Sequence, residues 1–203
     1  MALTPLRHTY PSHTVRAFTL VEMLVVMAIF VVISAVTLAS NSRFGGNVTL
    51  ETLAYDIALS VRQAQVYGIA VRRSDLGSSD FGRAYGIHVN SVTPNSYQLF
   101  ADIAPGDGLY SCPDPENPST CELVQNMTLQ GGFAISDLCV RPIGQAEMCD
   151  REELNIIFRR PEPDAFIRVD GIQTYEQARV VVGSPQGGEA SVLIELAGQI
   201  SVQ

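Results

Sequence analysis

The chain has 203 residues and a formal net charge of −8 at pH 7, from 13 basic and 21 acidic residues. This length fits one domain, or one domain with an anchor. The acidic balance makes the chain as a whole a poor partner for nucleic-acid phosphates, although it leaves a local basic patch open.

The first 17 residues are polar and basic, with Arg7 and Arg16 and no acid. An ordinary secretory signal is cut after its apolar stretch, but here the apolar stretch comes later and would be retained. Two interpretations follow: residues 1–17 are a leader that is removed, or they are the cytoplasmic tail of a signal-anchored protein. In both, the arginines favour a cytoplasmic N-terminus and an outward-facing C-terminal part.

Residues 23–40 form a run of 18 residues without a charge, about long enough to cross a bilayer core as a helix. The run predicts a transmembrane helix over residues 18–40. Glu22 lies at its entrance, where a carboxylate is costly if it is deeply placed. It therefore either reaches the headgroups or meets a cation in the membrane.

The residues around Glu22 form the most specific motif in the chain. Ala17 is followed by Phe-Thr-Leu-Val-Glu over Phe18 to Glu22. This pattern resembles the N-terminus of type IV prepilins and type II secretion pseudopilins, which have a basic leader, a small residue, usually Gly, and then Phe-Thr-Leu-Xaa-Glu. The resemblance implies cleavage by prepilin peptidase between Ala17 and Phe18 and N-methylation of Phe18. It also implies that Glu22 contacts the α-amino group of Phe18 in a neighbouring subunit. Ala17 departs from the usual Gly, and prepilin peptidases accept Ala less well.

A second apolar pattern follows the membrane segment. Gly45 and Gly46 weaken a helix by about 1 kcal/mol each, so they mark either a break or a flexible point in one long helix. Residues 41–67 are predicted as its amphipathic second half. The residues that recur at helical spacing and predict its buried face are Leu50, Leu53, Ile57, Val61 and Ala64. The end of this helix also resembles that of the GspH/FimT-type minor pilins.

The remaining residues, 68–203, predict a β-rich extracytoplasmic domain. Three hairpins are expected, over residues 84–89 with 96–102, 154–160 with 165–170, and 177–182 with 190–196, because short turns separate alternating apolar runs. Strands joined in this way indicate an antiparallel sheet. The predicted fold class is therefore α+β, and the resemblance implies the type IV pilin fold, with a helical spine packed on the sheet.

Four cysteines lie in the β-rich part, at Cys112, Cys121, Cys139 and Cys149. None belongs to a C-x-x-C pair, and His88 is the only histidine after residue 17, so a structural zinc site is disfavoured and no metal is expected. In an exported domain the four thiols predict two disulfides with three possible connectivities. Loop length alone favours Cys112 with Cys121 and Cys139 with Cys149.

No catalytic motif and no cofactor fingerprint occur in the sequence, so we expect neither an enzyme nor a cofactor. His88 is expected at a surface or a sheet edge. The acids of a Gly/Pro-rich loop, Asp102, Asp107, Asp114 and Glu116, match no known calcium motif, so a solvated loop is favoured and calcium binding stays open.

The favoured function is a structural subunit, a minor pilin or pseudopilin of a type IV pilus or a type II secretion system. The resemblance implies that its partners are prepilin peptidase, an inner-membrane assembly platform and other pilin subunits. Three alternatives remain: a major type IV pilin, a DNA-binding minor pilin for transformation, and a signal-anchored binding domain. Residues 198–203 lack the arginine found in the C-terminal tail of DNA-binding FimT proteins, which counts against nucleic acid.

Overall fold

The computed structural model describes residues 18–70, 82–103, 106–114, 117, 120–169, 172–173 and 175–203, with the backbone alone for 39–47 and 172–173. Residues 1–17, which include Ala17, lie outside the described residues, as does Glu116. The described elements are α1 (Leu20–Ile69), β1 (Ala84–Asn90), β2 (Ser96–Asp102), β3 (Leu123–Thr128), β4 (Ala134–Pro142), β5 (Glu153–Phe158), β6 (Ala165–Val169), β7 (Ile172–Gln173), β8 (Tyr175–Gly183), β9 (Glu189–Glu195) and β10 (Ile200–Val202).

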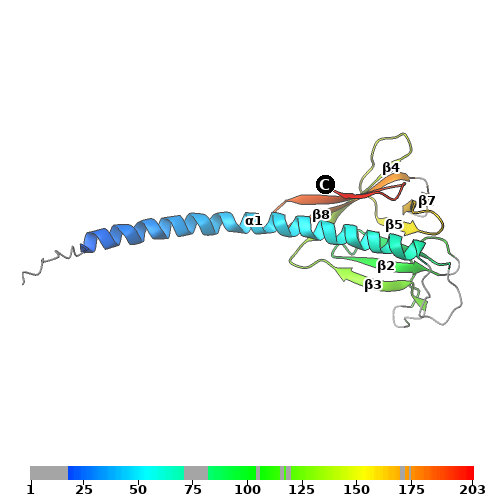
Figure 1. Ribbon diagram of the computed structural model, residues 1–203, viewed down its shortest axis with the longest axis horizontal. Coiled ribbons are helices and arrows are strands. Elements are labelled where there is room, and N and C mark those ends of the chain that lie inside the picture. The colour runs from blue at the N-terminus through cyan, green and yellow to red at the C-terminus, as the bar shows by residue number, and fades with distance from the viewer. Residues whose placement is uncertain are drawn as a thin grey trace, which may run out of the picture. The chain divides into compact units, whose positions relative to one another are not determined.

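Helix α1 contributes to two compact units, Met1–Ser42 and Arg43–Gln203. Figure 1 shows α1 in blue and cyan and the strands from green to red. An N-terminal apolar helix followed by antiparallel sheets confirms the predicted α+β fold class and is consistent with a pilin fold.

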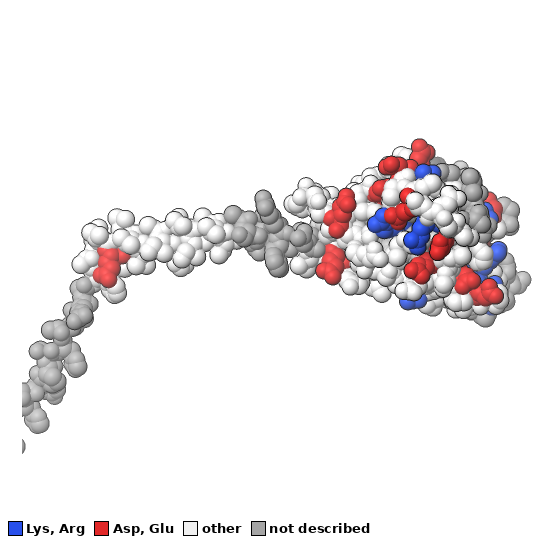
Figure 2. Space-filling view, turned by 90° about the horizontal axis from the view of Figure 1, so that it is seen from above, with Lys and Arg blue, Asp and Glu red and all other residues white. Residues whose placement is uncertain are grey.

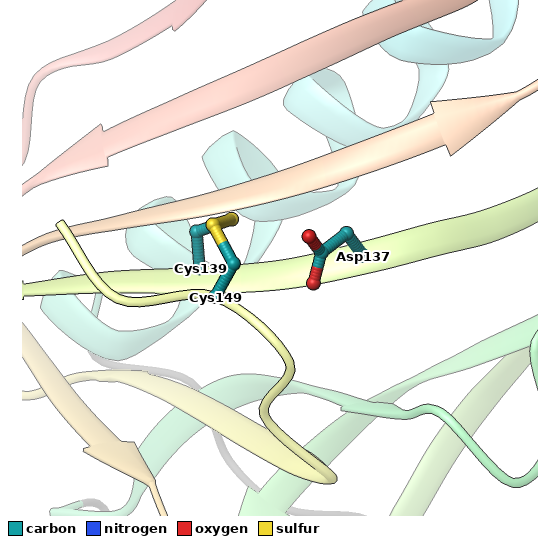
Figure 3. A group of neighbouring side chains, drawn as sticks. All are labelled: Asp137, Cys139 and Cys149. Atoms are coloured by element: carbon teal, nitrogen blue, oxygen red, sulfur yellow. A yellow bond between two sulfur atoms is a disulfide. The ribbon is translucent and has the colours of Figure 1, made fainter.

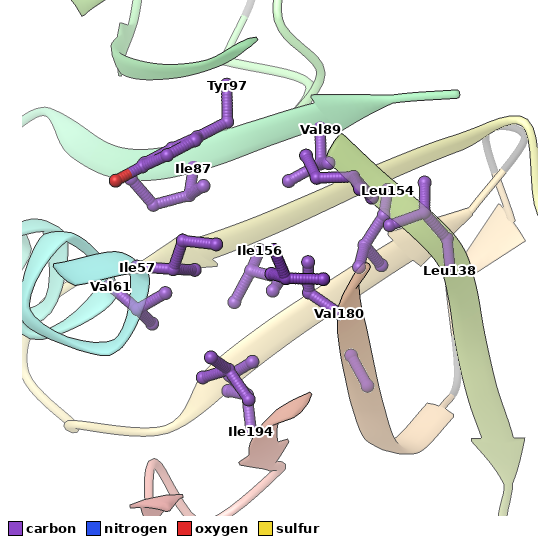
Figure 4. Packing of buried hydrophobic residues seen from close by; sticks show 14 of the residues in the cluster. Ile57, Val61, Ile87, Val89, Tyr97, Leu138, Leu154, Ile156, Val180 and Ile194 are labelled. Atoms are coloured by element: carbon purple, nitrogen blue, oxygen red, sulfur yellow. The ribbon is translucent and has the colours of Figure 1, made fainter. Parts of the chain in front are cut away.

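In the second unit, one stripe of α1 is buried. Its residues are Leu50, Ala54, Ile57, Val61 and Ala64, which are spaced at three and four residues as expected for one face of a helix. Ala54 belongs to this buried stripe, whereas Leu53, which was predicted to belong to it, is only half-buried. Figure 4 shows Ile57 and Val61 pointing from the helix into the hydrophobic core.

The strands form two sheets, with every pair antiparallel. The first has the order β3-β2-β1-β5-β6-β7 and the second β10-β9-β8-β4. One hydrophobic cluster joins α1 to both sheets, with Ile87 and Ile156 from the first sheet and Val180 and Ile194 from the second (Figure 4). The unit therefore has one core shared by three layers of secondary structure.

All three predicted hairpins are confirmed, as β1 with β2, β5 with β6 and β8 with β9. The single sheet expected from them is wrong. Strand β4 pairs with β8, more than thirty residues later, instead of with its neighbours in sequence. Turn residues mark local hairpins but carry no information about such distant pairs, so the division into two sheets was not visible in the sequence.

The last turn of α1 lies against strand β5 and two turns. A Cβ atom at Gly68 would lie 2.2 Å from the carbonyl oxygen of Phe158, so only glycine permits this approach. One turn earlier, the buried Gln65 amide donates to the carbonyl oxygens of Pro163 and Gly198, both at 3.0 Å. Its own oxygen accepts from Arg62 at 2.6 Å. These contacts fix the helix end on the β-rich unit.

Candidate functional site

The first turn of α1 contains the described part of the N-terminal motif. Phe18 and Thr19 are not helical, and the Phe18 side chain is 73% exposed. The backbone N–H of Glu22 donates to the Thr19 hydroxyl at 3.2 Å, and the N–H of Met23 donates to the Thr19 carbonyl at 3.2 Å. Thr19 is therefore the N-cap of the helix, and Glu22 occupies the third helical position, the acidic position of a capping box.

The segment that follows is apolar on all sides. Leu20–Leu38 is long and apolar enough to cross a membrane, and none of it is buried inside the protein. In Figure 2 this segment is white, the colour of uncharged residues, apart from the acidic colour near its start. The hydroxyl of Thr37 donates to the carbonyl oxygens of Ile33 and Ser34, at 3.1 and 2.9 Å. That polar group is thus satisfied within the helix itself, as an apolar environment requires.

Glu22 is the one ionisable residue of this apolar segment. Its side chain is exposed, and among the described residues no cation pairs with it. A carboxylate in the first turn is favoured by the positive end of the helix dipole. In a membrane, however, an unpaired charge costs several kcal/mol. The arrangement therefore presents an acceptor for a cation supplied from outside the described chain.

The part of α1 in the second unit carries an exposed apolar stripe as well as the buried one. Its residues are Val48, Tyr55, Leu59 and Val66, each more than half exposed. Their spacing of seven, four and seven residues places them along one side of the helix. Exposed apolar patches of this kind mark sites of protein or membrane contact.

Both pairs of cysteines are disulfide-bonded, Cys112 with Cys121 and Cys139 with Cys149. Figure 3 shows the carboxylate of Asp137 beside the second bond. The three side chains lie close enough for a metal site, but bonded sulfurs offer no thiolate. Instead, the Asp137 carboxylate accepts the N–H of Asp150 at 2.9 Å. The second disulfide and this hydrogen bond together fix the loop between β4 and β5.

The loop between β2 and β3, which contains the first disulfide, covers part of the outer face of the first sheet. Tyr110 of this loop stacks on His88, with ring centroids 4.8 Å apart, and meets the edge of Phe100 at 5.7 Å. The carboxylate of Glu122 accepts the N–H groups of Ile103 and Ser111, both at 2.8 Å. Glu122, at the end of the loop, therefore holds its start and its middle, a role that no sequence pattern indicated.

The acids of this loop bind its own backbone. Asp102 accepts the N–H of Gly108 at 3.1 Å, and Asp107 accepts that of Leu109 at 3.0 Å. Burial raises the pKa of Asp102, and burial likewise raises the pKa of Glu122. Within the described residues, Asp102, Asp107 and Asp114 do not gather into a group that could hold a metal. The sequence analysis favoured a solvated loop, but Asp102 is buried, and the hydrogen bonds of Asp102 and Asp107 hold the loop's own backbone.

His88 is buried, so the expectation of a surface or edge position is wrong. It lies on β1 between two neighbouring strands, and its Nδ1 is 2.9 Å from Oδ1 of Asn155. Burial lowers the pKa of the imidazole, while Asn155 and the charge of Glu153 raise it by less. The alternation of β1 did not reveal this, because both faces of the strand are covered.

Several arginines of the second unit have acidic or aromatic partners. Arg179 pairs with Glu147, and Arg141 lies 3.9 Å from Glu176. The Arg159 guanidinium lies 4.1 Å from the centroid of the Phe166 ring. In Figure 2, basic groups lie among acidic ones on the face shown. On this face, the described residues therefore do not form the basic patch or stripe that is typical of a nucleic-acid-binding surface.

Comparison with known proteins agrees with the N-terminal geometry. A protein-family model, the Prokaryotic N-terminal methylation motif, matches residues 13–38. The match supports a type IV pilin-like protein and indicates a structural subunit rather than an enzyme. The motif is typical of pilins that prepilin peptidase processes and that assemble with other pilins, and with the apolar helix it suggests a membrane-anchored protein. No curated protein and no solved structure matches the chain significantly.

Proposed function

We propose that this protein is a minor pilin or pseudopilin, of the GspH/FimT kind, in a type IV pilus or a type II secretion pseudopilus. Residues 1–17 are a leader that prepilin peptidase removes between Ala17 and Phe18, and Phe18 is then N-methylated. Residues 18–40 cross the membrane before assembly, and 41–67 continue the helix. Residues 68–203 form the extracytoplasmic domain, stabilised by the two disulfides.

The observation that carries this proposal is an apolar helix that the protein does not cover and that has one carboxylate at its start. Leu20–Leu38 is exposed throughout, and Glu22 is its only charge. Two such helices gain little from meeting in lipid, so a polar contact can select one partner geometry. Cleavage before Phe18 creates an amine suited to this contact. We infer that Glu22 pairs with the amine of Phe18 in a neighbouring subunit.

The exposed stripe of Val48, Tyr55, Leu59 and Val66 supports the same proposal. It gives the part of α1 that belongs to the β-rich unit an apolar surface of its own for contact. A protein that used its N-terminal segment only as an anchor would have no need for this stripe. The stripe therefore favours a subunit packed through its helix over a signal-anchored binding domain.

Substitution of Glu22 tests the assembly role. Glu22→Gln keeps the size and the hydrogen-bonding oxygen but removes the charge, and we expect the protein to remain in the membrane fraction and to be lost from filaments or pseudopili. Glu51→Gln is the matched control, since Glu51 is an exposed acid on the same helix, and it should assemble normally. Equal assembly of both variants and the native chain would refute the role of Glu22.

Intact mass under non-reducing conditions tests the processing. We expect a species that runs from Phe18 to Gln203, carries one added methyl group and lacks four hydrogens for two disulfides. Abundance in sheared surface filaments would indicate a major pilin, and trace amounts a minor pilin or pseudopilin. A mass that still contains residues 1–17, in cells with an active prepilin peptidase, would contradict the proposal.

A further inference from the structure

Thr19 is the N-cap of helix α1. It lies just C-terminal to the peptide bond between Ala17 and Phe18, which the proposed function assigns to cleavage. Its hydroxyl accepts the N–H of Glu22 and its carbonyl accepts the N–H of Met23, both at 3.2 Å, while Phe18 and Thr19 themselves are not helical. An N-cap residue has non-helical backbone angles and satisfies an otherwise unpaired donor of the first turn. The helix therefore begins at Leu20, two residues after the peptide bond between Ala17 and Phe18.

The position at which the helix begins matters for cleavage. If α1 began one turn earlier, the carbonyl oxygen of Ala17 would accept the N–H of Val21 inside the helix. That carbonyl is the group that a peptidase must polarise and attack, and a helical turn would occupy its oxygen and surround its carbon. Leader removal thus requires that the helix begin on the C-terminal side of this bond.

The sequence before Thr19 does not itself stop a helix. No Gly or Pro occurs between Ser12 and Phe18, and Ala17 is the best helix former at the place where prepilins usually have Gly. Alanine favours the helical conformation over glycine by roughly fivefold. A threonine N-cap favours a helix start at its own position by roughly the same factor. The cap at Thr19 is therefore strong enough to offset the loss of glycine at 17.

We propose that Thr19 is a positioning residue for leader removal: its cap holds the bond between Ala17 and Phe18 outside α1 and compensates for alanine at position 17. This inference rests on the proposed function, because it takes that bond as the cleavage site. It adds a role for Thr19 that is separate from recognition of the motif by the peptidase.

The test measures the initial rate of leader removal from the full-length precursor by a prepilin peptidase in liposomes. Thr19→Val keeps the shape of the side chain but removes the oxygen acceptor, and we expect cleavage to slow by roughly fivefold. Thr19→Ser keeps the acceptor and should cleave at the native rate. Thr37→Val is the matched control, because that hydroxyl bonds carbonyls within the helix, and it should leave the rate unchanged.

A second pair of variants separates the helix effect from direct contact with the peptidase. In an Ala17→Gly background, the slowing by Thr19→Val should shrink to less than twofold, because glycine already opposes the helix there. Amide hydrogen exchange of residues 16–20 in the precursor should be slower in Thr19→Val than in the native chain. Equal slowing in both backgrounds, or unchanged exchange, would overturn the inference. Failure of the native precursor to be cleaved would overturn the proposed function as well.

Discussion

The two parts of α1 contain similar side chains in opposite circumstances. Ile33, in the first unit, is 58% exposed, whereas Ile57, in the second, is 1% exposed. The second unit covers its stripe of α1 with two sheets, and the first unit covers nothing of Leu20–Leu38. The difference shows that the chain covers one part of the helix and leaves the other exposed, as the proposed membrane span and helix contacts would need.

This contrast explains where specificity must come from. Burial of an apolar side chain stabilises the second unit by about 25 cal/mol for each Å² removed from water. The same side chain in lipid gains almost nothing from meeting another helix. In the proposed assembly, the first part of α1 therefore needs a polar group to define its partner, and Glu22 is the one ionisable residue of Leu20–Leu38. The second part needs none, because packing against β-strands already selects one arrangement.

The largest effect is expected at Gly68, where the helix comes closest to a strand. Gly68→Val would place side-chain atoms against the carbonyl of Phe158, which a Cβ alone would approach to 2.2 Å. We expect a loss of more than about 4 kcal/mol in the free energy of unfolding, measured by urea unfolding of the full chain in detergent micelles. Val66→Ala, an exposed change two residues away, should alter it by less than about 0.5 kcal/mol. Comparable stability of the two variants would show that α1 does not rest on β5.

The direct test of the comparison is the same substitution in each part of the helix. Ile57→Ala should lower the free energy of unfolding of the β-rich unit by about 2–5 kcal/mol, since it leaves a cavity in the core. Ile33→Ala should leave that free energy unchanged. The same urea titration measures both, and a filament or membrane-retention assay then shows whether Ile33 matters elsewhere. An equal loss of stability in both variants would mean that the two parts of α1 are not independent.

The sequence predicted well those features that depend on local pattern. The buried stripe at Leu50, Ile57, Val61 and Ala64 followed from helical spacing, and three hairpins followed from turn residues. The pairing of Cys112 with Cys121 and of Cys139 with Cys149 in the structure is the one that short loops favour. In each case the residues that interact lie within about one or two turns or one hairpin of each other.

The features that the sequence did not reveal depend on residues far apart in the chain. Gln65 donates to the carbonyls of Pro163 and Gly198, which lie 98 and 133 residues away in the sequence. Nothing in the sequence distinguishes Glu122 from other acids beside strands, because its partners Ile103 and Ser111 meet it only in the folded loop. His88 was expected at a surface or a sheet edge, but Tyr110 of the loop between β2 and β3 covers its face of the sheet. No periodicity encodes such contacts, because they arise only when tertiary structure brings the partners together.

Gln65 offers a smaller test of how the second part of α1 is fixed. Gln65→Leu keeps most of the volume but removes the donor shared by the carbonyls of Pro163 and Gly198. Because unpaired buried acceptors are costly, we expect a loss of about 2 kcal/mol in the free energy of unfolding. Gln63→Leu is the matched control, since among the described residues the Gln63 side chain bonds the Tyr67 hydroxyl of the same helix and no distant carbonyl. Similar losses in both variants would contradict the anchoring role of Gln65.

The smallest effect is expected from pH, and it concerns only the second unit. The pKa of His88 is lowered by burial, so the unfolded chain binds its proton more readily than the folded one. Its contribution to stability is therefore complete above the unfolded imidazole pKa of about 6.5 and is lost as pH falls through the folded value. Asp102 and Glu122, whose pKa values burial raises, act in the opposite direction, since the folded protein holds their protons more tightly. His88→Gln isolates the first contribution: between pH 7.5 and 5.5 its urea midpoint should fall less than that of the native chain. Identical pH profiles would show that the imidazole protonates as readily in the folded protein as in the unfolded chain. The loop that carries Tyr110 would then not exclude water from His88.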